Sequence, residues 1–288
     1  MHPLPFHLAA ARGSLLTLLA GLASMLLVAC GEPPWNNPHP PARDELITYK
    51  SVMTPSPPKH LDPAISYASD EALFIMQIYE PPMAYHFLKR PYELLPGALA
   101  SFPEVTYLDK NGGELDDAAA EVALTRYTLR LRNDLQYQPH PAFALDQDGN
   151  PLYLFATAAE GAAFRGIPDF PETGYRAVNA NDYAYSIKRL ADPRNGSPML
   201  GFMSQYILGM REFSGTLAET PAEEWQNLDD YPMEGLSVLD ERTLTITIMG
   251  RYPQFVYWLA MPFFSPVAPE VDRFYHNPGF AERNLTLD

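Results

Sequence analysis

Cysteine, cations and glycine are all scarce in this chain of 288 residues, and each shortage excludes a class of protein. The single thiol, Cys30, cannot form an intramolecular disulfide and cannot supply a cluster of thiolate metal ligands. Only 20 Lys and Arg stand against 35 Asp and Glu, a formal net charge of −15 at pH 7. Such a chain repels a phosphate backbone, so nucleic-acid binding is not expected. The 17 glycines are outnumbered by 30 prolines, which predicts rigid extended connections and few long helices.

Sequence signatures of catalysis and of metal binding are also missing. The chain has no Gly-x-Ser-x-Gly elbow, no glycine-rich phosphate loop, no dinucleotide fingerprint and no His pair at i, i+4 spacing. The acid pairs at 116–117 and 229–230 are interpreted as solvated loop residues and not as a carboxylate dyad. The Asp-x-Asp segment at 146–150 departs from a calcium loop, because Gly149 is its fourth residue and Thr157 its twelfth. No catalytic residue, metal or cofactor is therefore predicted.

The N-terminus has the pattern of a targeting segment. Arg12 precedes an apolar run at 14–29, which as a helix would reach about 24 Å, short of the ~30 Å hydrocarbon core of a bilayer. Residues 27–31, Leu-Val-Ala-Cys-Gly, resemble the lipobox of bacterial lipoproteins, which implies cleavage before Cys30 and acylation of that residue. The alternative is an ordinary signal peptide with Cys30 as a buried core thiol. The proline-rich residues at 33–41 predict an extended tether.

Apolar patterning over the rest of the chain predicts helices alternating with hairpins, which is a mixed α/β fold. The helix expected at 70–79, entered through Ser69, is apolar on almost its whole circumference, so we expect it to be buried. The strand at 243–248 is expected to face a core through Leu244, Ile246 and Ile248. The other expected elements are a strand at 46–49, a hairpin of 104–108 with 124–132, a hairpin of 143–145 with 152–155, a helix at 180–190 capped by Asn179, a short helix from 220 to 228, and a strand at 236–238 pairing with 243–248.

Several of these segments, taken in order, resemble the family 5 extracellular solute-binding proteins, the oligopeptide- and dipeptide-binding receptors of ABC importers. The most specific is residues 179–193, Asn-Ala-Asn-Asp-Tyr-Ala-Tyr-Ser-Ile-Lys-Arg-Leu-Ala-Asp-Pro. The others are His-Leu-Asp-Pro-Ala at 60–64 with the helix that ends at 78–80, Leu-Leu-Pro-Gly-Ala-Leu-Ala at 94–100, Tyr-Thr-Leu-Arg-Leu-Arg at 127–132, the strand 243–248 with 252–255, and residues 259–267. Their order over residues 46–281 carries the resemblance, and the lipobox agrees with it.

The resemblance implies a fold like that of the type II periplasmic-binding proteins, of which this chain corresponds to the first lobe. It implies a signal peptide at 1–29, a tether at 30–45, the first part of a base lobe at 46–82, an inserted smaller subdomain at 83–250, and a return to the base lobe at 251–288. Family members are much longer, so we expect the second lobe to be absent and the cleft to be incomplete. This chain by itself is therefore expected to bind peptide weakly or not at all.

By resemblance, the chain is a receptor for peptides or peptide-like solutes and not an enzyme. Acylated Cys30 would hold it to the lipid bilayer, in the periplasm or at the outer face of the cytoplasmic membrane, and it would deliver its ligand to an ABC permease. The family contacts ligand through the backbone just after the Leu-Asp-Pro turn and has an aromatic cleft wall. These features map onto Ile65, Ser66, Tyr67 and Ala68, and onto Tyr206, respectively. The alternative interpretation makes Tyr67 a packing residue at a helix entry and Tyr206 a core residue.

Two other classes of function remain open from the sequence. One is a periplasmic lipoprotein hydrolase, and the other is a structural or chaperone-like surface lipoprotein. Stabilisation by a ligand without product would favour the receptor, and product formation would favour the hydrolase. The absence of both results would favour the structural or chaperone-like lipoprotein.

Overall fold

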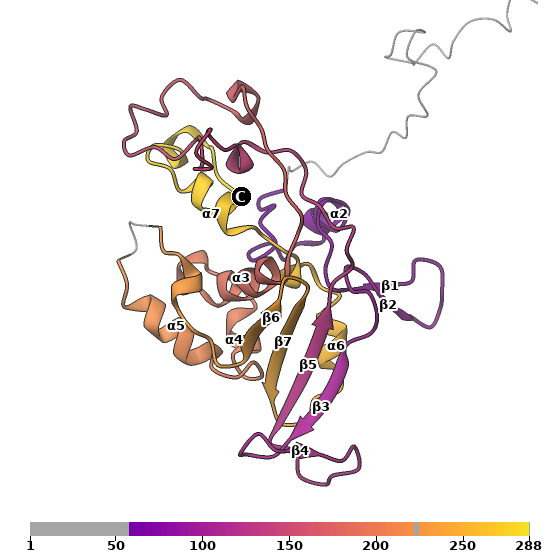
Figure 1. Cartoon of the computed structure of the whole chain (residues 1–288). Coiled ribbons are helices and arrows are strands. Elements are labelled where there is room, and N and C mark those ends of the chain that lie inside the picture. The colour runs from indigo at the N-terminus through magenta and orange to yellow at the C-terminus, as the bar shows by residue number, and fades with distance from the viewer. Residues whose placement is uncertain (1–57, 222–224, 288) are drawn as a thin grey trace, which may run out of the picture. The chain divides into compact units, whose positions relative to one another are not determined.

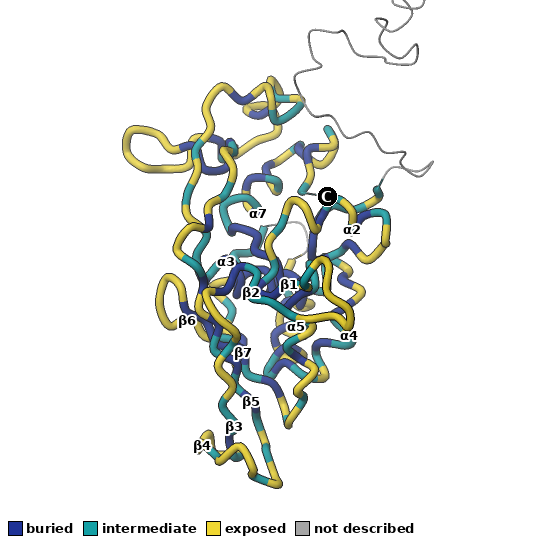
Figure 2. The backbone as a smooth tube through the Cα atoms, turned by 90° about the vertical axis from the view of Figure 1, so that its right-hand side faces the viewer, coloured by how far each residue is buried: buried dark blue, intermediate teal, exposed yellow. Residues whose placement is uncertain are grey.

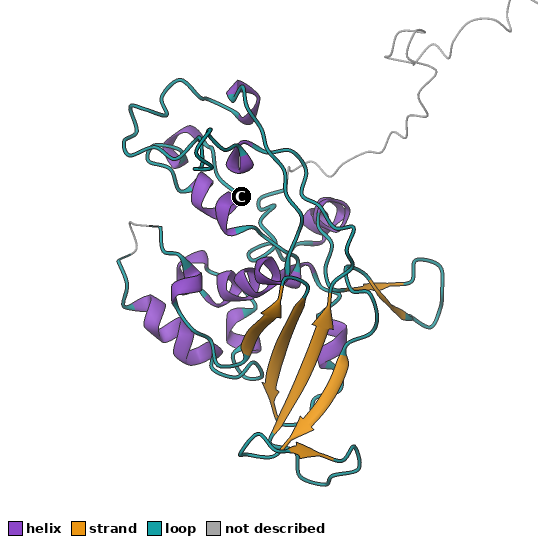
Figure 3. Cartoon of the chain, viewed as in Figure 1, coloured by secondary structure: helices purple, strands orange, loops and turns teal. Residues whose placement is uncertain are grey.

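The structure is a computed structural model that describes residues 58–221 and 225–287 (Figure 1). The expected signal peptide at 1–29, the tether at 30–45, Cys30 and the first strand at 46–49 lie outside the described residues. The described part is mixed α/β, as the sequence predicts, with short helices beside a sheet (Figure 3). No helix within this part combines the length and the apolar character needed to cross a bilayer.

The helices and strands are short, in keeping with the high proline content. The helices are α2 (Ser69–Ile78), α3 (Ala180–Ala191), α4 (Leu200–Met203), α5 (Met210–Ala218), α6 (Phe255–Trp258) and α7 (Pro269–Tyr275). The strands are β1 (Met83–Tyr85), β2 (Leu94–Pro96), β3 (Glu104–Leu108), β4 (Glu114–Leu115), β5 (Leu124–Arg130), β6 (Leu236–Asp240) and β7 (Thr243–Met249).

The main sheet is antiparallel, with strand order β4-β3-β5-β7-β6. Glu104 lies opposite Thr128 and Leu108 opposite Leu124, so the hairpin predicted from the two alternating runs is confirmed. The predicted pairing of β6 with β7 is also confirmed, with a register shift between Val238 and Asp240. Because side chains alternate between the faces of a strand, β7 sends three apolar residues to one face. These are Leu244, Ile246 and Ile248, all fully buried, as predicted.

Helix α3 is the centre of the core, and both of its ends follow the sequence signals. Asn179 caps it by accepting a hydrogen bond from the N–H of Asp182, whose side chain accepts in return from the N–H of Asn179. Pro193 follows shortly after the last helical residue. Tyr183, Tyr185 and Ile187 are almost completely buried against the sheet and the following helices.

Helix α2 corrects one expectation, because it is not buried all round (Figure 2). Glu71 and Ile75 are buried, whereas Leu73 is 65% exposed and Met76 55% exposed. The helix contacts the 3₁₀ turn Pro262–Phe264 and leaves Leu73, Met76 and Ile78 largely exposed. An apolar circumference therefore does not by itself determine how many sides of a helix are covered.

Two further expectations are wrong in detail. The segment expected as a strand at 143–145 begins inside the 3₁₀ turn Pro141–Phe143, where proline favours a turn, and only Leu145 and Pro151 form a β-bridge. Of the short helix expected from 220 to 228, residues 222–224 lie outside the described part, and residues 225–227 are not helical. The indole Nε1–H of Trp225 instead donates a hydrogen bond to Oδ2 of Asp272 at 2.8 Å.

A second apolar cluster includes Phe274 of α7 and contains several aromatic rings in contact. Phe164 and Phe170 stack with centroids 4.2 Å apart, and Phe170 meets Phe274 of α7 edge-on at 5.2 Å. The cluster joins the long connection between β5 and α3 to the C-terminal residues Phe280 and Leu285. It holds the connection against α7, which gives the candidate site one of its walls.

Candidate functional site

A buried ion-pair network fixes the segments that surround the site. Arg189 of α3 donates from Nε to Oδ1 of Asp272 in α7 at 2.8 Å, and from Nη1 and Nη2 to both carboxylate oxygens of Asp62. Burial alone would raise the pKa of Asp272, but the Arg189 charge, helped by hydrogen bonds from Tyr185 and Trp225, lowers it. Three segments far apart in the chain are thereby held at one point.

A cavity of about 640 Å³ lies beside this network, within the usual size range of ligand pockets. Tyr79 and Glu80, just after α2, form one part of its lining, and Val271 and Tyr275 of α7 form another. The extended residues 135–140 run along it. The cavity thus lies where the connection between β5 and α3 meets α7 and the end of α2.

The extended segment presents a backbone edge at this cavity. Its inner side pairs with the chain before α3, since the Tyr137 N–H donates to the Arg176 carbonyl and the Val178 N–H to the Leu135 carbonyl, each at 3.0 Å. Between these bonds, the N–H and carbonyl of Gln136 point away from the pair. Within the described residues, the backbone groups of Gln136 and Gln138 make no hydrogen bond, and both residues line the cavity.

His140 lines the cavity as a neutral ring. Its Nδ1 accepts from the Ala142 N–H at 3.1 Å, which assigns the ring proton to Nε2. That nitrogen lies 3.0 Å from the Tyr275 hydroxyl, to which it donates. Burial lowers the pKa of His140 to about 4, so the ring carries no charge at pH 7.

The remaining polar groups of the lining are mostly uncharged. Burial raises the pKa of Tyr79 to about 12, and the nearby Asp62 carboxylate adds to this effect. Tyr183 donates its hydroxyl to the Glu80 carbonyl at 3.0 Å. The Glu80 carboxylate is the one acidic side chain of the lining and lies 3.4 Å from Arg132. The cavity therefore offers aromatic surface, neutral hydrogen-bonding groups and one carboxylate.

The sequence-predicted ligand residues 65–68 form the turn that leads into α2, and their N–H groups are engaged within it. Ile65 and Ser66 donate to the Asp62 carbonyl at 3.1 and 2.9 Å, and Tyr67 and Ala68 donate to Oε2 of Glu71 at 3.2 and 3.1 Å. Only the carbonyl groups of residues 65–68 therefore remain for the predicted backbone contact with a ligand. The Tyr67 ring is 71% exposed and stacks on Phe263 at 6.0 Å.

Tyr206 lies elsewhere in the fold, in an aromatic group at the end of the main sheet. Its ring stacks on Tyr252 at 4.4 Å and contacts Phe202 at 5.2 Å, so it is half-buried by packing. Neither Tyr206 nor residues 65–68 line the 640 Å³ cavity. Their assignment to a ligand site stays a prediction.

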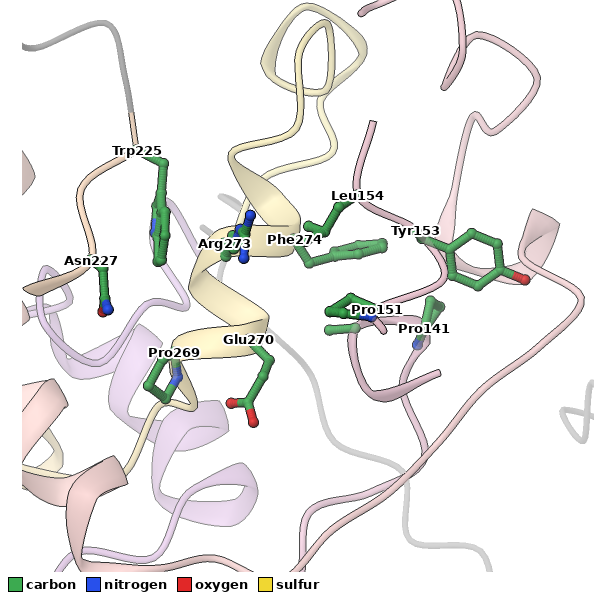
Figure 4. A pocket seen from close by; sticks show the side chains of 11 residues that line it. Pro141, Pro151, Tyr153, Leu154, Trp225, Asn227, Pro269, Glu270, Arg273 and Phe274 are labelled. Atoms are coloured by element: carbon green, nitrogen blue, oxygen red, sulfur yellow. The ribbon is translucent and has the colours of Figure 1, made fainter. Parts of the chain in front are cut away.

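A second hollow, of about 140 Å³, opens between α7 and the segment around Pro151 (Figure 4). Arg273 of α7 lies 5.2 Å above the Trp225 ring, and Phe274 points toward the opposite wall near Tyr153. The carboxylate in the lining of this hollow belongs to Glu270 and is already paired with Arg176 at 2.6 Å. At this volume the hollow is smaller than an ordinary ligand pocket, and it has no free acidic group.

The sequence reasoning missed the residues that line the larger cavity, above all Gln136, Gln138, His140 and Tyr275. One signal was present, because Gln and Tyr alternate at 136–138 and prolines stand at 139 and 141. Proline in an alternating run is typical of an edge strand. That signal indicates an edge but does not show which segments lie beside it.

No protein-family model matches the chain, and a search of curated proteins gives no match. Similar solved structures exist. A periplasmic oligopeptide-binding protein of an oligopeptide ABC transporter from Borrelia burgdorferi aligns at 19% identity over 76% of this chain, with a TM-score of 0.46. The murein tripeptide binding protein MppA of Escherichia coli aligns at 20% identity over 73% of this chain, with a TM-score of 0.44. OppA of Haemophilus influenzae, in complex with the peptide RPPGFSPFR, aligns at 16% identity over 74%, with a TM-score of 0.44.

The aligned part is a limited portion of these proteins. This chain covers 31% of the Borrelia protein and 29% of the Escherichia and Haemophilus proteins. The Borrelia and Escherichia proteins are described as binding proteins, and the Haemophilus protein was solved with a peptide bound.

Proposed function

We propose that this chain is the peptide-recognising part of a solute receptor that serves an ABC importer. The observation that supports this most directly is the backbone edge of Gln136 and Gln138 along the 640 Å³ cavity. A peptide in an extended conformation pairs with such an edge through its own N–H and carbonyl groups, which every peptide has. Recognition of this kind gives affinity without requiring a particular side-chain sequence.

The lining of the cavity favours binding over hydrolysis. Tyr79 and Tyr275 supply aromatic surface for varied side chains. The Glu80 carboxylate, more than half exposed and 3.4 Å from Arg132, suits a further cationic group such as a peptide amino terminus. The lining contains no Ser, Thr or Cys side chain that could serve as a nucleophile. A receptor that binds and releases peptide is therefore preferred to the hydrolase.

The location and domain organisation are part of the same proposal. Residues 1–29 would be removed, acylated Cys30 would anchor the chain at a bilayer outside the cytoplasm, and residues 30–45 would act as a tether. Residues 46–82 and 251–288 would form the base lobe, with 83–250 inserted between them. Carbonyl groups of 65–68 would add contacts to the ligand, with Tyr67 and Tyr206 as aromatic surface. The bound peptide would then pass to a permease in the cytoplasmic membrane.

A pair of substitutions at one position tests the backbone edge. Gln138→Pro removes the N–H, whereas Gln138→Ala removes only the side chain, so the alanine variant is the matched control. Within the described residues the N–H of Gln138 makes no hydrogen bond, so proline at this position removes no internal hydrogen bond of the fold. Titration of a pool of short peptides, followed by the amide NMR signals of Gln136 and Tyr137, should show weak binding for the wild type and Gln138→Ala. Gln138→Pro should weaken it about tenfold, the value of one hydrogen bond.

Equal affinity of the two variants would overturn the edge as the peptide site. Mass spectrometry of the same samples tests the alternative function, a hydrolase, since cleaved peptides would establish it.

The lipid anchor is tested separately, by labelling cells with a radioactive fatty acid. The wild-type chain should be labelled and Cys30→Ser should not, and equal labelling would contradict acylation of Cys30.

A further inference from the structure

The hairpin of β1 and β2 projects from the rest of the described fold (Figure 1, Figure 3). Its tip, residues 86–93, carries Phe87 at 88% exposure and Leu88 at 77%, the highest values among the large apolar side chains of the described residues. Burial of apolar area is the main favourable term in folding and association, so two such side chains at a projecting end indicate a surface that contacts something else.

Hydrogen bonds within the tip hold it in this conformation. Nδ1 of His86 accepts from the N–H groups of Leu88 and Lys89 at 3.2 and 3.3 Å. Arg90 donates from Nη1 to the Lys89 carbonyl at 2.8 Å, and Lys89 pairs with Glu93 at 2.8 Å. The outward position of Phe87 and Leu88 is therefore fixed by the turn and does not result from a lack of local structure.

Tyrosine rings surround the base of the tip. Tyr85 meets Tyr92 edge-on at 5.9 Å and stacks with Tyr257 of α6 at 6.5 Å, and all three rings are exposed. The Arg90 guanidinium lies 4.3 Å above the Tyr92 ring. Tyrosine is typical of the boundary between a bilayer and water, because its ring is apolar and its hydroxyl is polar.

The charge of the tip is opposite to that of the chain. Lys89 and Arg90 outnumber Glu93, whereas the whole chain has a formal net charge of −15. A strongly acidic protein is repelled by an anionic membrane, so a local cationic site is needed for any contact with one. The tip thus combines two exposed apolar side chains with two adjacent cations and with tyrosine rings at its base. This combination suits the interface of an anionic bilayer, where apolar groups enter the hydrocarbon boundary and cations stay at the headgroups.

We propose that the β1–β2 tip inserts Phe87 and Leu88 into the interface of a bilayer that contains anionic lipid, with Lys89 and Arg90 at the headgroups. The contact is weak by itself, because it buries two side chains, and it orients the fold against the membrane. This inference is independent of the peptide site and of acylation at Cys30. A protein partner at the tip is the competing outcome of the test.

Tryptophan at position 87 reports insertion directly. In the full chain, Phe87→Trp keeps an aromatic side chain in the tip, and the spectrum of the unmodified chain is subtracted to remove the three native tryptophans. Vesicles of phosphatidylcholine with phosphatidylglycerol should shift the difference spectrum to the blue, and brominated lipids should quench it. The control, Leu239→Trp in exposed strand β6, should show neither change.

Charge and apolar contact are then separated by further variants. Lys89→Gln in the Phe87→Trp chain should reduce the shift, and Leu88→Ser should reduce quenching, while circular dichroism shows an unchanged fold. Vesicles of phosphatidylcholine alone should give a smaller response. An equal response at 239, an equal response to neutral vesicles, or a response only when a membrane protein is added would each overturn the proposal.

Discussion

The guanidinium of Arg189 binds both carboxylate oxygens of Asp62, a residue 127 positions earlier, at 2.9 and 2.7 Å. Both side chains are almost completely buried, at 4% and 2% exposure. The same guanidinium also binds Asp272, so one cation serves two carboxylates. Its removal would leave both acids in a poorly solvated place without a partner.

Arg189→Leu should therefore lower the free energy of unfolding by about 3–5 kcal/mol, the cost of removing one partner of a buried pair. Urea denaturation at pH 7 measures it. The matched control is Arg130→Leu, because Arg130 pairs with Glu104 at 2.9 Å on the surface and both side chains are at least half exposed. That control should change the stability by about 0–1 kcal/mol. Similar losses for the two variants would contradict the structural role of the buried pair.

Ile246→Asp should destabilise the sheet by several kcal/mol, roughly 3 or more, because it places an unpaired carboxylate in the core. Ile246 is fully buried in β7, opposite Tyr127 of β5. Leu239→Asp introduces the same charge in the neighbouring strand at a site that is 61% exposed, and it should leave the melting temperature nearly unchanged. An unchanged melting temperature for Ile246→Asp would show that this face of β7 is not covered.

Acid should destabilise the entry to α2. Burial alone would raise the pKa of Glu71, but hydrogen bonds from the Ser66 hydroxyl and from the N–H groups of Ala68, His60 and Tyr67 outweigh it and lower the pKa from 4.5 to about 2. A lowered pKa in the folded state means stability that is complete above pH 4.5 and is lost as the pH falls from 4.5 toward 2.

Glu71→Gln tests this, because the amide keeps the shape of the side chain without its charge. Its unfolding free energy should be about 2 kcal/mol lower at pH 7, and its loss of stability below pH 4.5 should be smaller than that of the wild type. Asp70→Asn, also in the first turn of α2, should cost only about 0.3–1 kcal/mol. A wild-type acid dependence retained in Glu71→Gln would show that other carboxyls are responsible.

The His140 ring should titrate near pH 4, below its ordinary pKa of 6.5, because burial disfavours the imidazolium. The neutral ring is favoured by folding, so this part of the stability is complete above pH 6.5 and is lost as the pH falls toward 4. NMR of the ring protons measures the titration. His140→Asn should flatten the stability profile between pH 6.5 and 4.5. A His140 pKa at or above 6.5 would contradict its burial beside Tyr275.

Several elements could be predicted because their signals are local. Asn179 and Asp182 are three residues apart, and the capping bonds that they make depend on that spacing alone. The alternation in β5 and β7 determined which residues face the core, and it agrees with the burial of Leu129 and Ile246. Helix α2 shows the limit, because its apolar composition indicates contacts without showing which sides are covered.

The sequence by itself determined the cap of α3, the two hairpins of the main sheet, the acidic charge, the shortage of cysteine and the absence of catalytic motifs. Only the tertiary structure decided that Gln136 and Gln138 run beside Tyr79 and Tyr275, and that Arg189 lies between Asp62 and Asp272. The physical reason is the sequence separation of the residues that interact. Caps and strand alternation act over a few residues, whereas the cavity and the buried ion pairs depend on packing between segments more than 50 positions apart.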